Sequence, residues 1–195
     1  SPLHANYLSG GASLQEKLDK LGLNWNDVFQ KQKDLINKKT KEYYRAILQD
    51  VKKADSARLN SISLVDLVTV LGIRAKASKE EIKNMKDEDA FLFAIKNGMV
   101  GKNSVSENTL GDIQVDNNFA KAEMLANKEA SGVYFHFYRE NNVWKLNLTD
   151  IFYLGNISLK KMFEKSSKSK FEFLLEILEY MNGKEISHSI LQPIE

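Results

Sequence analysis

The stretch VYFHFYRENNVWKLNLTD, residues 133–150, alternates large apolar and polar side chains on either side of Asn141-Asn142. An alternation with a period of two is typical of a β-strand that buries one face. Two consecutive Asn residues tolerate the positive φ angles that a two-residue hairpin turn requires. The stretch therefore predicts a β-hairpin, and this hairpin decides the fold class.

The position of the turn fixes which side chains share a face of this hairpin. Counting outward from Asn141-Asn142 gives one mainly apolar face, made of Phe135, Phe137, Trp144, Leu146 and Leu148 together with Arg139. The opposite face pairs Tyr138 with Lys145, His136 with Asn147, and Tyr134 with Thr149. We expect the apolar face to be buried and the other face to be half-exposed. We also expect the Arg139 guanidinium to lie over the Trp144 ring as a cation–π pair.

A second hairpin is predicted around Asp116-Asn117-Asn118, between the strand-like runs 112–116 and 119–126. The same counting rule places its small and apolar side chains on one face, namely Ile113, Val115, Ala120, Ala122, Met124 and Ala126. Both hairpins thus obey one register rule, and two consecutive hairpins form an antiparallel meander.

Helical spacing and capping residues predict helices before and after these strands. Before the strands, the sequence predicts a short helix between Ser13 and Gly22 and a longer helical stretch from Asn24 to Val51, with a break near residues 37–40. It also predicts a helix 64–71, capped by Ser63 and ended by Gly72, a helix opened by the capping box Ser78…Glu81, and a helix between Asp87-Glu88-Asp89 and Asn97-Gly98. After the strands, it predicts helices 159–164, capped by Ser158, and 170–182, between Ser169 and Gly183. The predicted fold class is α+β, with N-terminal helices packed on a curved, cone-like antiparallel meander sheet and an added C-terminal helix.

We predict three segments along the chain. Residues 1–12, which contain Ser9-Gly10-Gly11, are expected to be a flexible leader. Residues 13–157 are expected to hold the helices and the sheet, and residues 158–195 a C-terminal helical extension that ends in a strap.

Composition excludes several classes of function. The 195 residues carry a net charge of +2, which is too small an excess to indicate nucleic-acid binding. The chain has no cysteine, so disulfides and thiolate zinc sites are excluded, and no spacing of its three histidines predicts a metal site. No phosphate-binding glycine loop is present, and we expect no cofactor. No apolar run is long enough for a transmembrane segment. Two locations stay open: the cytoplasm, or export with association to the cell envelope.

The last predicted strand, Trp144-Lys145-Leu146-Asn147-Leu148, resembles the final strand of the nuclear transport factor 2-like superfamily. The resemblance is closest to bacterial members of unknown function, in which a helix similar to residues 86–95 precedes two strands and a Trp-Lys hairpin. It extends over residues 24–151. It implies a cone-shaped α+β fold, and in many members the outer face of the sheet mediates dimers.

Enzymatic relatives in this superfamily, such as polyketide cyclases, ketosteroid isomerase and scytalone dehydratase, use Asp, His or Tyr side chains in a pocket between the sheet and the helices. Here the corresponding face carries apolar side chains and no acid–base pair, so we expect a binding or interaction module without catalytic activity. Its expected partners are a second copy of the chain or a small apolar ligand. The candidate ligand or interface residues are Tyr134, His136, Tyr138 and Asn147. The alternative is a cyclase, isomerase or dehydratase in which His136 and a neighbouring Tyr act as acid and base.

Overall fold

The computed structural model describes residues 16–24, 36–99, 110–126 and 128–195. The predicted leader lies outside the described residues. The chain divides into two compact units, and each is described by itself: unit 1 comprises Ser1–Lys41 and Val100–Ile151, and unit 2 comprises Glu42–Met99 and Phe152–Glu195. Along the sequence, two of the three boundaries fall within helices α4 (Lys38–Lys53) and α9 (Thr149–Ser166), and the third falls between Met99 and Val100.

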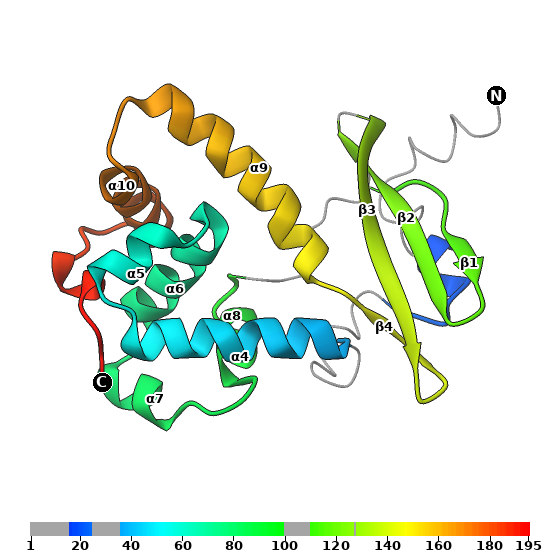
Figure 1. Cartoon of the computed structure of the whole chain (residues 1–195), viewed down its shortest axis with the longest axis horizontal. Coiled ribbons are helices and arrows are strands. Elements are labelled where there is room, and N and C mark those ends of the chain that lie inside the picture. The colour runs from blue at the N-terminus through cyan, green and yellow to red at the C-terminus, as the bar shows by residue number, and fades with distance from the viewer. Residues whose placement is uncertain (1–15, 25–35, 100–109, 127) are drawn as a thin grey trace. The chain divides into compact units, whose positions relative to one another are not determined.

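Unit 1 contains a four-stranded antiparallel meander in the order β1-β2-β3-β4 (Figure 1). Its strands are β1 (Gln114–Asp116), β2 (Phe119–Ala126), β3 (Glu129–Glu140) and β4 (Val143–Leu146). The α+β class and the meander are therefore as predicted. The sheet is not strongly curled.

Both Asn-Asn turns are two-residue hairpin turns, which confirms the predicted register as far as the pair Phe137–Leu146. The predicted pair of Tyr134 with Thr149 is wrong, because β4 ends at Leu146 and Thr149 begins α9. Asp116 pairs with Phe119 across the first turn, and Glu140 pairs with Val143 across the second. The φ angle is +50° at Asn141 and +61° at Asn142, which is the left-handed region that the short polar side chain of Asn tolerates.

The predicted apolar face is buried except at its turn end, where Trp144 is half-buried and Arg139 is exposed. Phe135, Phe137, Leu146 and Leu148 are at most 1% exposed, and the rings of Phe135 and Phe137 meet edge to face with centroids 5.1 Å apart. On β2, Ala120 lies opposite Phe137 and Ala122 lies opposite Phe135, and both Ala residues are buried. Their small side chains leave room for the two rings. Val115 lies on the same face as Ala120, as predicted, but it is 52% exposed on the short edge strand β1.

Unit 2 is helical. Besides the greater part of α4 and α9, it contains α5 (Ser56–Ser61), α6 (Leu64–Lys76), α7 (Lys79–Asn84), α8 (Asp89–Lys96), α10 (Lys170–Asn182) and the short 3-10 helix η2 (His188–Leu191). The predicted caps Ser63, Ser78 and Ser169 each accept a backbone N–H of the following helix, the latter two in complete capping boxes. Gly183 ends α10 with a φ of +65°. Helix α10 packs against α6 within this unit.

The predicted end of a helix at Gly72 is wrong, because α6 continues to Lys76. Gly72 serves close packing instead: a Cβ atom at this position would lie 2.7 Å from Met99 Cε. The predicted helix 159–164 is part of the longer α9, which begins ten residues earlier than Leu159. The final predicted strand is correspondingly shorter, since β4 ends at Leu146.

A buried arginine joins the C-terminal strap to the end of α4 within unit 2. The Arg74 guanidinium, in a residue that is 5% exposed, donates hydrogen bonds of 2.8–2.9 Å to four backbone carbonyls, those of Asp50, Val51, Ala54 and Ile190. The carbonyl end of a helix carries partial negative charge, so a cation is favourable there. None of the helices in the described parts of the chain is both long and apolar enough to cross a membrane.

Candidate functional site

The side chains that alternate away from the buried face form what we call the outer face of the sheet. It consists of Phe119, Lys121 and Glu123 on β2 and of Tyr134, His136 and Tyr138 on β3. Phe119 lies opposite Tyr138, Lys121 opposite His136, and Glu123 opposite Tyr134. All six side chains are half-buried. Three of the four predicted site residues, Tyr134, His136 and Tyr138, thus lie together on one surface.

The outer face is organised by aromatic contacts. The Phe119 ring stacks on the His136 ring with centroids 5.6 Å apart, and it meets the Tyr138 ring edge to face at 5.6 Å. Lys121 Nζ lies 4.7 Å from the centroid of the Tyr134 ring. This is a cation–π contact on the outer face. On the other face Arg139 and Trp144 are cross-strand partners, and their cation–π contact stays a prediction.

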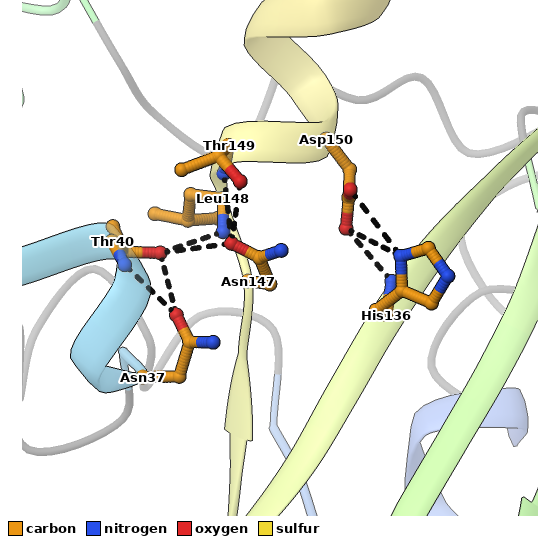
Figure 2. Close-up of polar contacts among 7 residues, drawn as sticks. All are labelled: Asn37, Thr40, His136, Asn147, Leu148, Thr149 and Asp150. Carbon is orange, nitrogen blue, oxygen red and sulfur yellow. Dashed lines mark hydrogen bonds and ion pairs between the residues drawn. The ribbon is translucent and has the colours of Figure 1, made fainter. Parts of the chain in front are cut away.

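His136 is held by Asp150, which lies in the first turn of α9 (Figure 2). The His136 backbone N–H donates to Asp150 Oδ2 at 2.9 Å, and His136 Nδ1 lies 3.2 Å from Oδ2 and 3.3 Å from Oδ1. A carboxylate only accepts, so the proton of the neutral ring resides on Nδ1 and Nε2 is left as an acceptor. The side chains are 31% and 16% exposed, respectively.

The reason for this pairing is the early end of β4. His136 lies one residue beyond the last β3–β4 pair, so its N–H has no carbonyl of β4 opposite it. The Asp150 carboxylate takes the place of that carbonyl, while Asn147 N donates to His136 O at 3.1 Å. The pair is therefore part of the way in which the chain leaves the sheet, besides being a potential acid–base group.

Burial affects the acidic groups of this cluster. Burial raises the pKa of the Asp150 carboxyl above its ordinary value, although the hydrogen bonds and charge of His136 and the charge of Lys39 oppose the change. Burial, with a smaller effect of the Asp150 charge, raises the pKa of the Tyr138 hydroxyl. Tyr138 is consequently a protonated hydrogen-bond donor at neutral pH.

Asn147, the fourth predicted residue, does not join the outer face. It is 1% exposed, and its Oδ1 accepts from Thr149 N at 3.3 Å and from Thr149 Oγ1 at 2.7 Å. Thr40 Oγ1 lies 3.4 Å from the same oxygen and accepts the Leu148 N–H at 3.0 Å (Figure 2). Asn147 thereby fixes the start of α9 beside the first turn of α4.

The start of α4 is also capped by an Asn side chain. Asn37 Oδ1 accepts from Thr40 N at 3.0 Å and from Thr40 Oγ1 at 2.8 Å, as an N-cap residue does. Thr40 is thus shared between the two helix starts (Figure 2). The polar side chains of this junction are engaged with one another, which is the behaviour of structural groups in a buried position.

Sequence reasoning missed Asp150 because it placed residues 147–150 in the last strand and the next helix at residue 159. A signal was present: Asn147-Leu148-Thr149-Asp150 has small polar residues followed by an acid, which is typical of a helix start. Its pairing with His136 depends on where β4 ends, and the alternating pattern continues past that point.

Comparison with family models, with curated proteins and with solved structures finds no significant match. Among the described residues, no three His, Asp or Glu side chains come together in a way that could hold a metal ion.

Proposed function

We propose that this protein is a binding module without catalytic activity and that the outer face is its binding surface. The observation that carries the proposal is the group of four half-exposed aromatic rings on β2 and β3, namely Phe119, Tyr134, His136 and Tyr138. Aromatic rings with a polar tip are enriched at protein interfaces because they bury a large area while still finding hydrogen-bond partners.

The partner that this surface fits is a second copy of the chain. A two-fold interface brings the same patch of both copies together, so the patch has to be complementary to itself. The outer face carries the cation Lys121 and the anion Glu123 two residues apart on β2, between the aromatic rings. An isologous contact can therefore place each cation against an anion of the other copy.

The family we propose is the nuclear transport factor 2-like superfamily, bacterial in type. Helices followed by a meander that ends in the Trp144-Lys145 hairpin support it. The cone shape is not part of this support, because the sheet is not strongly curled. A small apolar ligand, the other expected partner, has less support. The Phe and Leu side chains of the apolar face are already buried within the protein and offer little surface to such a ligand.

The experiment is sedimentation velocity over a wide range of concentrations. The wild-type chain is expected to dimerise, and the double variant Tyr134→Ala/His136→Ala to remain monomeric at the same concentrations. Tyr180→Ala is the control, because Tyr180 is 90% exposed on α10 in the other unit. A wild-type chain that is monomeric throughout, or a double variant that dimerises equally well, contradicts the proposal.

A second candidate is a small-molecule enzyme of the cyclase, isomerase or dehydratase type. The observation that favours it is the contact of Asp150 with His136 Nδ1, which leaves Nε2 available as a general base. Tyr138, two residues away on the same face, would act as the acid. Proton exchange with deuterated water at the carbon next to a ketone carbonyl needs only such a base, and NMR can follow it for a panel of cyclic ketones. Exchange that is no faster than with His136→Gln removes this candidate.

A further inference from the structure

A polar hollow of about 390 Å³ adjoins the outer face within unit 1. Its lining includes two carboxylates, two amines, an aromatic ring and an aliphatic side chain, those of Asp112, Glu123, Lys121, Lys128, Tyr134 and Leu125. The volume lies in the range of small-molecule sites. Tyr134, Lys121 and Glu123 belong to the outer face as well, so the hollow is a part of the proposed binding surface.

The hollow forms where the two long strands depart from a regular ladder. The register of β2 against β3 shifts between Glu123 and Leu125, and Gly132 on β3 has a φ of +75°. Bulges of this kind bend a strand and redirect its side chains, and they are frequent beside functional sites. Gly111 closes the other side, donating its N–H to Glu123 O at 2.7 Å.

Hydrogen bonds and a cation–π contact hold the residues around the hollow in position. Glu123 Oε1 accepts the Gly132 N–H at 2.8 Å, so the carboxylate has a fixed position. Lys17 Nζ donates to Leu110 O at 2.6 Å and secures the segment that carries Asp112. The ammonium of Lys121 is held at 4.7 Å from the Tyr134 ring centroid. One anion and one cation are therefore positioned in advance, which lowers the cost of ordering them around a ligand.

The formal charges of the lining balance, with two carboxylates against two amines. A polyanion or a polycation would meet as much repulsion as attraction there. A small molecule that carries one positive and one negative group could place each of them beside protein side chains of the opposite charge, as electrostatic complementarity requires. The aliphatic and aromatic side chains of Leu125 and Tyr134 would contact an apolar group beside those charges.

We propose that this hollow binds a zwitterion of the amino-acid class. The ammonium group of the ligand pairs with Asp112 and Glu123, its carboxylate pairs with Lys121 and Lys128, and its side chain lies against Leu125 and Tyr134. The inference deepens the proposed binding function and rests on it, since it gives the outer face a small-molecule ligand that would engage Lys121 and Glu123 in place of the charges of a second copy.

The test is an NMR titration of the full, ¹⁵N-labelled chain with L-leucine up to about 10 mM, which would saturate a site with a Kd of order 1 mM. L-leucinamide lacks the carboxylate and N-acetyl-L-leucine lacks the ammonium group. L-leucine is expected to shift the amide signals of Gly111, Lys121, Glu123 and Tyr134, and each derivative to bind about tenfold more weakly. Absence of these shifts, or derivatives that bind as tightly as L-leucine, overturns the inference.

Glu123→Gln makes the test specific, because a Gln oxygen still accepts the Gly132 N–H while the charge is removed. This variant is expected to bind L-leucine about tenfold more weakly. Glu129→Gln is the matched control, because Glu129 is exposed on β3 outside the hollow. The affinity of this variant for L-leucine should equal that of the wild type. Equal affinities of both variants overturn the inference.

The sedimentation experiment separates the two proposals. A chain that dimerises through the outer face without responding to L-leucine retains the proposed function and loses only the ligand class. A monomeric chain that binds L-leucine as described loses the self-association and retains the hollow as its binding site.

Discussion

Replacing Asp150 by Asn and by Ala separates the two roles of its carboxylate, as a hydrogen-bond acceptor and as a charge. Asp150 Oδ2 accepts the His136 N–H at 2.9 Å, and the Asp150 side chain is 16% exposed. An Asn oxygen retains this acceptor without the charge, whereas Ala leaves the N–H without its partner. The two variants should therefore differ in the free energy of unfolding.

The expected magnitude follows from the contacts. Loss of an acceptor for a buried backbone N–H costs about 1–3 kcal/mol. His136 is only half-buried, so the lower part of that range applies, and loss of an acid in the first turn of α9 adds a few tenths. We expect Asp150→Ala to lower the free energy of unfolding by about 2 kcal/mol. Asp150→Asn should stay within about 0.5 kcal/mol of the wild type at pH 7.

The pH dependence has a definite sign. Burial raises the pKa of Asp150 in the folded state above the ordinary value of about 3.9. The folded state then binds the proton more tightly than the unfolded state, so this group favours folding below about pH 3.9 and loses that contribution as the pH rises through the folded pKa. The wild type should accordingly gain stability relative to Asp150→Asn as the pH falls from 7 through the folded pKa toward that value.

Urea denaturation followed by circular dichroism at pH 7 and at several lower values measures these differences. An Asp150→Asn variant that loses as much as Asp150→Ala would refute the reasoning, because it would show that the charge rather than the acceptor stabilises the junction. An Asp150→Ala variant as stable as the wild type would also refute the reasoning, because it would show that the hydrogen bond from the His136 N–H does not stabilise the fold.

Three further substitutions test the buried face of the sheet, the second hairpin turn and the buried arginine of unit 2. Phe137→Ala should lower the free energy of unfolding in urea by about 3–5 kcal/mol, because the ring is fully buried, and a loss below 1 kcal/mol contradicts the buried face. Asn142→Ala should cost about 1–2 kcal/mol in thermal unfolding while Asn142→Gly is tolerated, since φ is +61°; equal effects contradict a left-handed turn. Arg74→Met should cost about 3 kcal/mol and speed hydrogen exchange at the end of α4, whereas unchanged exchange there contradicts its role as a helix-end donor.

The hairpins could be predicted because their determinants are local. A period of two assigns side chains to faces, and the Asn pair fixes the register to the residue. The capping boxes at Ser78 and Ser169 were equally readable, since each involves residues three apart. The three predicted residues of the outer face followed directly from the same register.

Other features depended on distant neighbours. Gly72 has the sequence character of a helix end, yet α6 continues through it to Lys76, and Met99 Cε lies close to the place that a side chain at position 72 would occupy. Arg74 follows Gly72 in the sequence like an ordinary surface residue, and its burial arises from carbonyls 20 or more residues away. Neither position carries a local pattern that distinguishes these roles.

The sequence by itself determined the α+β class, the hairpin register and the separation of a buried face from an outer face, because each follows from side-chain period and turn chemistry within a few residues. Only the tertiary structure decided that β4 ends at Leu146, that Asp150 takes over the His136 N–H, and that Asn147 is buried at the junction instead of lying on the outer face. The physical reason is that a backbone group left without a ladder partner has to be satisfied by whatever side chain the fold brings near it.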